Sequence, residues 1–329
     1  MLVLGRADVE SALDADTLID AMGPAMADLS ADRVSAPNRT ATVVAAGETF
    51  TGLLDMPAYV PSSGALTSKL VSVFPGNTGT EHPVRQAIVV VFDPRTGTPA
   101  AVLDGTSLTA ARTAACSALS ARLLARADSE ILAILGTGVQ ARAHARFVSR
   151  VRPFRQVRVA GSDRDRTAAA AAALAAELDV EVAAAPFYQE ALDGADVVCG
   201  ATFAAEPAIR RAWLAPGTHV TSVGYHPSGR EVDDETIAEA LLFVESRDAA
   251  LQAIPPNRDL AEPLQRGLIS AADIRAELGE LVAGTAVGRT DDRQLTLYKS
   301  VGVAVQDAAA AALVLSVAQE RGLGVHAPM

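Results

Sequence analysis

The stretch ILAILGTGVQARAHAR, residues 131–146, decides the fold of this chain. Its first five residues, Ile131 to Leu135, form an apolar run as long as a buried parallel strand. Gly136, Thr137 and Gly138 follow at once and lead into a segment of helix-forming residues. The stretch therefore predicts a strand, a tight turn and a helix in direct succession.

The glycines of this turn match the dinucleotide-binding pattern G-x-G-x-x-A. Gly136 can adopt the unusual backbone angles of the turn, Gly138 allows a close approach to the backbone, and Ala141 is small where the helix packs on the strand. The first turn of the helix would point its N–H groups at a pyrophosphate. Because any strand-to-helix turn favours glycine, the pattern alone is a weak indication and needs support from the surrounding sequence.

The chain after this stretch alternates strands with helices, including an alanine-rich helix at 167–178. Such alternation predicts an α/β fold with a doubly wound parallel Rossmann sheet, which binds its ligand at the carboxyl ends of the strands. Gly161, Thr202 and Gly224 stand at these ends, where small and hydroxyl side chains would leave room for a nucleotide. The further strands are predicted at 157–161, 181–185, 196–202, 219–224 and 241–246.

The residues after the second strand bear on the choice of cofactor. An NAD-binding domain carries an acid about 20 residues after the glycine pattern, and Gly161 occupies that place here. Ser162 and Arg164 favour a 2′-phosphate, whereas Asp163 favours the ribose hydroxyls of NAD. Arg164 also fits a solvated position at the start of a helix. The sequence predicts NADP(H) or NAD(H), with a slight preference for NADP(H).

The composition narrows the class of protein. The chain has 329 residues, enough for two domains, and its formal net charge of −11 without a basic stripe argues against nucleic-acid binding. No apolar run is long enough for a membrane span, and the N-terminus carries acids where a signal peptide carries basic residues, so a cytoplasmic protein is expected. The two cysteines should be buried, and the five scattered histidines show no metal-binding spacing.

A lysine is predicted on an apolar strand face in the N-terminal part. In the strand at 66–74, alternation puts Lys69 on the same face as Val71 and Val73. A lysine there is unfavourable unless its amine has a partner or is partly neutral. The alternative is an edge strand from which the lysine reaches water. Arg39 precedes a β-branched run, and that stretch alone favours a solvated strand-edge position.

Arg112 is a second cation that the sequence predicts at a buried position, in this case on a helix. A predicted hairpin, with a strand at 87–92 and a return strand ending at Leu103, leads to a helix that opens near Ser107. Arg112 would then lie in the first turn and on the buried stripe, where desolvation and the helix dipole both disfavour a cation. An anion should therefore lie opposite. It is either a structural Asp or Glu or, slightly favoured, a substrate carboxylate.

The last predicted helix indicates how the domains divide. The segment from Leu295 begins as a strand, becomes a helix near Ser300 and has no place in the alternating pattern. We expect this helix to return to the N-terminal part. The predicted domains are a second, α+β domain at 1–120 plus 298–329 and a dinucleotide-binding domain at 121–297.

Four segments together resemble the ornithine cyclodeaminase and mu-crystallin family, and the resemblance runs roughly from residue 35 to residue 320. The family includes ornithine and lysine cyclodeaminases, alanine dehydrogenases and imino-acid reductases, which all move hydride between a nicotinamide and the α-carbon of an amino acid. The resemblance implies an NAD(P)-dependent oxidoreductase acting on a small α-imino or α-amino acid. The segments are LTAARTAACSAL (108–119), GTGVQARAH (136–144), SVGYHPSGREVDD (222–234) and YKSVGVAVQDAAAAAL (298–313).

The resemblance also implies roles for individual residues. Arg39 and Arg112 would hold the substrate carboxylate, and Lys69 would be the catalytic amine. The α+β domain would bind the substrate and form a homodimer, and no metal is implied. Val223 and Ser300 would lie near the nicotinamide. The cofactor-binding residues would be Thr113, Gly136, Thr137, Gly138, Val139, Gln140, Gly161, Ser162, Asp163, Arg164, Thr202, Val223, Tyr225 and Ser300.

One departure from the family bears on the reaction. Cyclodeaminases carry an aspartate after the glycine that is Gly224 here, and this chain has Tyr225 and His226 instead. Without that carboxylate, deprotonation of the substrate amine and ring closure lack their usual base. The sequence therefore favours reduction of the C=N bond of an α-imino acid. A cyclodeaminase that recycles bound NAD and a non-catalytic NADPH-dependent binding protein are the alternatives.

Overall fold

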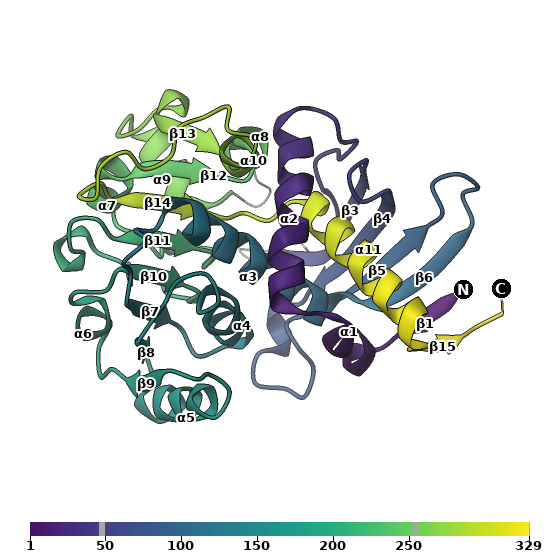
Figure 1. Cartoon of the computed structure of the whole chain (residues 1–329), viewed down its shortest axis with the longest axis horizontal. Helices are drawn as coiled ribbons and strands as arrows, with labels where there is room; N and C mark the ends of the chain where they lie inside the picture. The colour runs from purple at the N-terminus through teal and green to yellow at the C-terminus, as the bar shows by residue number, and fades with distance from the viewer. Residues whose placement is uncertain (46–49, 253–255, 329) are drawn as a thin grey trace. The chain divides into compact units, whose positions relative to one another are not determined.

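Two compact units make up the chain in the computed structural model, which describes residues 1–45, 50–252 and 256–328. Unit 1 combines Met1–Arg112 with Gly302–Met329, and unit 2 is Thr113–Val301 (Figure 1). The segment IPPNRDLAEPL at 254–264, whose prolines predict a loop, begins outside the described residues, and its later part contains helix α9 (Arg258–Gln265).

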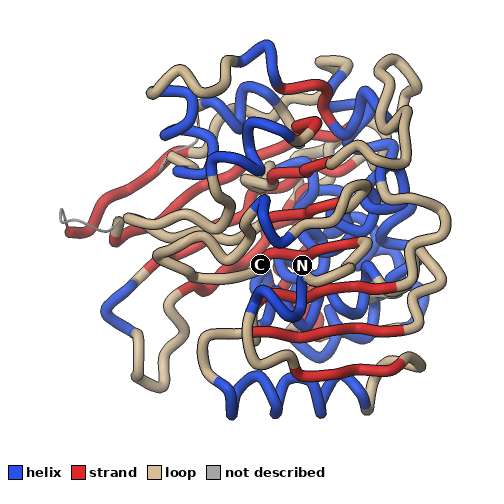
Figure 2. Tube along the Cα trace, turned by 90° about the vertical axis from the view of Figure 1, so that its left-hand side faces the viewer, coloured by secondary structure: helices blue, strands red, loops and turns tan. Residues whose placement is uncertain are grey.

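A parallel sheet forms the centre of unit 2. Its eight described strands lie in the order β13-β12-β14-β11-β10-β7-β8-β9, and neighbouring strands are parallel. Figures 1 and 2 show them stacked one above the next. The predicted Rossmann sheet is confirmed, with one strand, β13, in addition to those predicted from the sequence. The strands are β7 (Ile131–Leu135), β8 (Gln156–Ala160), β9 (Glu181–Ala184), β10 (Val197–Gly200), β11 (His219–Ser222), β12 (Leu241–Val244), β13 (Ile274–Glu277) and β14 (Thr296–Lys299).

The helices of unit 2 follow the strands as the alternating pattern predicts. Helix α3 (Gly105–Leu124) begins in unit 1 and continues into unit 2. Among the described residues, the structure has no helix that is both long and apolar enough to cross a membrane. The remaining helices of unit 2 are α4 (Val139–Val148), α5 (Arg164–Ala175), α6 (Tyr188–Leu192), α7 (Asp234–Glu239), α8 (Arg247–Leu251), α9 and α10 (Leu278–Val282).

Two buried histidines join the helices of unit 2 to its sheet. His144 Nε2 lies 2.9 Å from Ser117 Oγ on α3, and Ser117 Oγ accepts from Thr221 Oγ1 of β11 at 2.8 Å. His219 of β11 contacts Ser120 of α3 through Nε2 at 3.2 Å. Both imidazoles are 0% exposed, and these hydrogen bonds give their buried ring nitrogens partners in place of water.

Acid should therefore weaken the fold through these two residues. Burial lowers the pKa of His144 to about 4 and that of His219 to about 3. Below the ordinary value of 6.5 the unfolded chain binds more protons than the folded one, so stability falls as the pH drops. We expect each histidine to lower the free energy of unfolding by about 2 kcal/mol between pH 7 and pH 5, measured by urea unfolding. The free energy of unfolding of His144→Gln should fall less than that of the wild type over this pH range. An equal fall in both proteins would show that His144 does not cause the acid sensitivity.

A mostly antiparallel sheet forms unit 1. Its seven described strands lie in the order β15-β1-β6-β5-β4-β3-β2, and only β1 and β6 pair in parallel among them. The predicted hairpin is confirmed as β5 and β6, with its turn at Asp93–Gly97. The strands are β1 (Leu2–Leu4), β2 (Thr40–Ala45), β3 (Thr51–Val60), β4 (Ala65–Val73), β5 (Arg85–Phe92), β6 (Pro99–Asp104) and β15 (Val325–His326).

Helices cover one face of this second sheet. The long C-terminal helix α11 (Ala304–Arg321) packs against α2 (Ala15–Ser30) and against strands β3 and β4. Its buried stripe consists largely of alanines, which allow the helix to approach the sheet closely. The predicted return of the last helix to the N-terminal part is therefore confirmed. A shorter helix, α1 (Arg6–Ala12), also contacts α11.

Candidate functional site

The glycine turn after β7 has the geometry that a phosphate needs. Gly136 has φ +117°, and a Cβ there would lie 2.5 Å from the carbonyl oxygen of Ala201, so only glycine fits. Gly138 is the N-cap of α4, and a Cβ at Gly138 would have nothing within 4 Å. Since a glycine cap has no side chain to accept from the first-turn N–H groups, they can serve an anion. The turn therefore fits the pyrophosphate of a dinucleotide.

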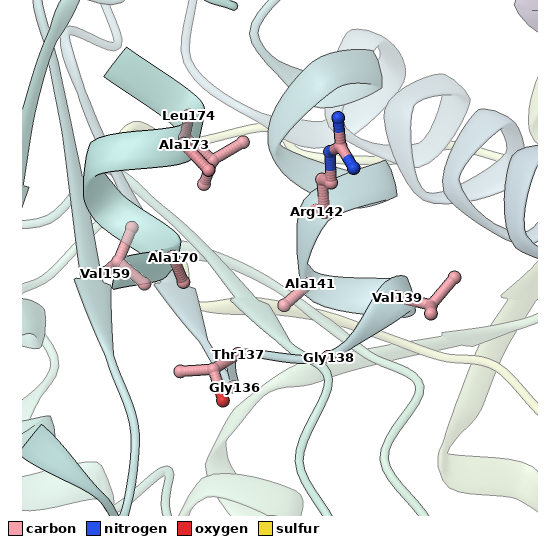
Figure 3. Close-up of a pocket in the computed structure, with 10 residues that line it drawn as sticks. All are labelled: Gly136, Thr137, Gly138, Val139, Ala141, Arg142, Val159, Ala170, Ala173 and Leu174. Carbon is pink, nitrogen blue, oxygen red and sulfur yellow. The ribbon is translucent and has the colours of Figure 1, made fainter. Parts of the chain in front are cut away.

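A cavity of about 340 Å³ opens beside this turn (Figure 3). The turn itself forms one wall, α4 contributes Arg142, and α5 contributes small apolar side chains. The volume is within the range of small-molecule pockets. The lining residues are Gly136, Thr137, Gly138, Val139, Ala141, Arg142, Val159, Ala170, Ala173 and Leu174.

The residues that bear on cofactor choice lie exposed at the end of β8. Asp163 is the N-cap of α5, where its carboxylate accepts from the N–H of Arg166 at 2.9 Å. The Arg164 guanidinium lies over the ring of Phe187, 5.2 Å from its centroid. Gly161 is explained by packing, because a Cβ there would lie 2.8 Å from Thr137 Cγ2. The space on the Cβ side of Gly161 therefore holds protein atoms, and contact between this residue and a nucleotide stays a prediction.

Glu231, which the sequence analysis missed, ties together the ends of β10 and β11. One carboxylate oxygen accepts from Thr202 N at 2.7 Å and from Thr202 Oγ1 at 2.8 Å. The other accepts from Ser222 Oγ at 2.5 Å and from Gly224 N at 2.9 Å. A Cβ at Gly224 would lie 2.2 Å from Glu231 Oε1. The absence of a side chain at Gly224 therefore makes room for this carboxylate, while contact of Thr202 and Gly224 with a nucleotide stays a prediction.

Lys299 and Asp259, also missed, extend this buried arrangement. Lys299 is 0% exposed, and its Nζ lies 2.7 Å from Asp259 Oδ2 and 2.8 Å from Ser222 Oγ. Asp259 Oδ1 accepts from the N–H groups of Glu231 and Val232 at 2.8 and 3.0 Å. One lysine and two carboxylates thus fix the loops at the carboxyl ends of the central strands, where a Rossmann domain holds its nicotinamide.

Three of the remaining predicted cofactor residues of unit 2 closely follow strands β11 and β14. Ser300 is buried and donates to Glu245 Oε1 at 2.5 Å, while Val223 and Tyr225 are half-buried. His226 is half-buried, and its ring packs on Phe203 with centroids 4.5 Å apart. The other predicted contacts are Thr113, buried on α3, and Gln140, half-buried at the start of α4.

Unit 1 contains the predicted catalytic lysine in the middle of its sheet. Lys69 lies on β4, between β3 and β5, and is directly opposite Met56 and Val89. It is 3% exposed, so the alternative of an edge strand with a solvated amine is wrong. Its Nζ forms an ion pair with Asp307 Oδ2 at 2.7 Å. The amine therefore has the partner that an apolar strand face requires.

Arg112 meets the same aspartate. Its Nε donates to Asp307 Oδ1 at 2.9 Å, and its Nη1 donates to Gln306 Oε1 at 2.5 Å. Helix α3 begins at Gly105, because Asp104 accepts from the first N–H groups of the helix, including that of Ser107 at 3.0 Å. Arg112 is consequently beyond the first turn, and the predicted helix-dipole penalty is wrong. The predicted anion is present as a structural aspartate.

A third cation, Arg39, lies in the segment before β2. It directly precedes the edge strand β2, as predicted, but it is only partly solvated, since it is half-buried and its Nη2 donates to the carbonyl oxygen of Gly302 at 2.7 Å. Gly302 has φ +76°, and a Cβ there would lie 3.2 Å from Arg112 Nη1. The backbone at Gly302 thus lies against both arginines. Unit 1 thus has Lys69 and Arg112 on the carboxylate of Asp307, with Arg39 as a third cation whose charge acts on Lys69.

The charges in this cluster set the acidity of the lysine. Burial lowers the pKa of Lys69 to about 8, with Asp307 acting in the opposite direction and Arg112 and Arg39 lowering it further. Burial alone would raise the pKa of Asp307, but Arg112 and Lys69 hold it below its usual value. An amine with such a pKa can give up and regain a proton near neutral pH.

Comparison with known proteins gives matches over nearly the whole chain. The model of the ornithine cyclodeaminase/mu-crystallin family matches residues 1–322. Ketimine reductase mu-crystallin of Mus musculus is 40% identical over 282 residues, 85% of this chain and 84% of that protein. The structure of Thermococcus litoralis Δ(1)-pyrroline-2-carboxylate reductase with NADH and L-proline is 35% identical, with a TM-score of 0.92 over 99% of this chain and 100% of that one. An archaeal alanine dehydrogenase dimer with bound NAD is 26% identical, with a TM-score of 0.88 over 99% and 98%.

Proposed function

The chain belongs to the ornithine cyclodeaminase/mu-crystallin family, and we propose that it reduces the C=N bond of small α-imino acids with NAD(P)H. The observation that carries this proposal is the cluster in unit 1, where Lys69 and Arg112 share one carboxylate and Arg39 adds a third positive charge that acts on Lys69. Excess positive charge at nearly buried side chains favours a substrate that brings its own carboxylate. The relative from Thermococcus litoralis was solved with L-proline, the amino acid obtained when pyrroline-2-carboxylate is reduced.

Each unit has a separate part in the proposed reaction. Unit 2 binds the nucleotide at Gly136–Gly138, and NAD(P)H, when bound, supplies a hydride. In unit 1, Arg39 and Arg112 bind the substrate carboxylate and so orient the imine carbon. The imine carbon accepts the hydride, and the imine nitrogen takes a proton from Lys69, which regains it from water. C=N thereby becomes CH–NH. The pKa of about 8 at Lys69 suits this proton transfer.

A panel of substrates tests this function. It combines keto acids with ammonia or methylamine, adds preformed cyclic imines, and follows the oxidation of NADH and NADPH. We expect oxidation with at least one cyclic or linear α-imino acid, since Tyr225 stands where cyclodeaminases carry a catalytic aspartate. Release of ammonia from ornithine or lysine without net nucleotide oxidation would instead identify a cyclodeaminase. Nucleotide binding without turnover of any member would identify a binding protein.

We propose a preference for NADPH, with Arg164 as the contact to its 2′-phosphate. The support is that Asp163 caps α5, while Arg164 lies exposed beside it over Phe187. Arg164→Ala should weaken NADPH binding by about 10- to 100-fold, as expected for one charge-assisted contact, and leave NADH binding nearly unchanged. Arg166→Ala, at another exposed arginine of α5, is the matched control and should change neither affinity. Equal losses for both nucleotides in Arg164→Ala would reject the assignment.

We propose that the sheet of unit 1 pairs with a second copy of the chain. The face opposite the helices exposes apolar side chains from several strands, including Leu53, Tyr59 and Ile88, which is 45% exposed. An apolar face of this kind favours burial, and the archaeal alanine dehydrogenase relative is a dimer. Sedimentation should give a dimer for the wild type and a monomer for Ile88→Asp. Leu268→Asp, on unit 2, should remain dimeric, and a monomeric wild type would refute the proposal.

A further inference from the structure

The cluster in unit 1 is organised around Asp307. Its carboxylate, 1% exposed, contacts Lys69 through one oxygen at 2.7 Å and Arg112 through the other at 2.9 Å. The residue lies in the first turn of α11, whose N-cap, Val303, makes no side-chain hydrogen bond. A carboxylate is favoured at that end of a helix. The fold thus places this anion where it can hold two cations from different elements, β4 and α3.

We propose that Asp307 is a positioning residue of the reductase, which holds Lys69 in its protonated form and aligns it with Arg112. The proposal rests on the proposed function, because it concerns the proton that Lys69 donates there. During reduction the new C–H bond takes the hydride pair, the C=N π pair becomes the nitrogen lone pair, and that lone pair takes the proton from Lys69 Nζ. Lys69 is left neutral beside Asp307, and water returns the proton.

The charges that face Lys69 explain why Asp307 is needed. Arg112 from α3 and Arg39 from the segment before β2 both repel a protonated amine, and burial acts in the same direction. Asp307 from α11 is the group that opposes these three effects. Without it, the pKa of Lys69 would fall below its present value of about 8, and the amine would be neutral at the pH where the enzyme must donate a proton.

The small number of lysines permits a direct measurement. The sequence has two, Lys69 and Lys299, so protein labelled with carbon-13 at lysine Cε gives two signals, which Lys69→Met assigns. In Asp307→Asn we expect the midpoint of the Lys69 titration to fall by about one pH unit or more. The alkaline limb of kcat/KM should move with it. Asp28→Asn removes another buried carboxylate of unit 1, one that binds Arg33, and should leave both unchanged.

Asp307→Glu separates positioning from charge. It keeps the anion, so the Lys69 midpoint should stay near the wild-type value, but the longer side chain misplaces both partners and should lower kcat more than about tenfold. An unchanged midpoint in Asp307→Asn would overturn the proposal, as would full kcat in Asp307→Glu. If Asp307→Asn does not fold, the Glu variant decides alone. The titration uses no substrate, so it still reports on Asp307 if the protein reduces no imino acid.

Discussion

Lys69→Met is expected to lower turnover of the preferred imino acid by about 10²- to 10⁴-fold, the range found for positioned proton donors. Methionine keeps the volume and the unbranched stem, so packing against Met56 and Val89 persists. Asp307 retains Arg112 as its partner, and the cluster does not leave an unpaired buried charge. The nucleotide turn belongs to unit 2, so the dissociation constant of NAD(P)H should not change.

The matched control for this variant is Thr67→Val, on the same buried face of β4 two residues earlier. It is nearly isosteric and changes no charge, so it should keep turnover within about twofold of the wild type if only the amine matters. Near-full turnover in Lys69→Met would show that Lys69 only pairs with Asp307. The proton would then have to come from another group.

Arg112→Lys is expected to lower kcat/KM for the imino acid by about 10- to 100-fold, mainly through a higher KM. Lysine keeps a positive charge near Asp307 but lacks the planar fork that can hold two acceptors at once. In the structure Asp307 and Gln306 occupy Nε and Nη1. The substrate carboxylate would therefore lose the remaining N–H donors of the guanidinium and not the positive charge.

Arg33→Lys provides the comparison, because Arg33 also pairs with a buried aspartate of unit 1, Asp28, at 2.7 Å. Both substitutions replace an arginine by a lysine, so a difference in KM between the two variants is due to the position of Arg112 in the structure. If Arg112→Lys lowers the melting temperature but leaves KM unchanged, Arg112 serves only to hold Asp307. The carboxylate-binding role would then be wrong.

Parts of the fold were predicted correctly where they depend only on residues that are adjacent in sequence. The strand, turn and helix at 131–146 follow from an apolar run and two glycines that are adjacent in sequence. The exposure of Lys69 could not be decided in this way, because it depends on β3 and β5 lying on both sides of β4. The first turn of α3 was misplaced because the helix starts two residues earlier, at Gly105.

Some of the residues that the sequence analysis missed interact over long sequence separations. Asp307 is 195 residues from Arg112, and no local spacing connects them. A usable signal was present nonetheless, since Asp307 is an isolated acid in the apolar segment VGVAVQDAAAAALVL at 301–315. A buried charge in such a helix needs a cation. Glu231 gave no comparable signal, because the acids of EVDDE at 231–235 resemble an exposed charged segment.

The transfer of deuterium from NAD(P)H that carries deuterium at both hydrogen positions of nicotinamide C4 to the product tests imine reduction most directly. With the best imino acid of the panel, we predict one deuterium at the α-carbon of the amino acid for each nucleotide oxidised, detected by mass spectrometry. Lys69→Met should slow this transfer without changing where the label goes. An amino acid formed without deuterium, or ammonia released from a diamino acid while the labelled nucleotide stays reduced, would contradict the central claim.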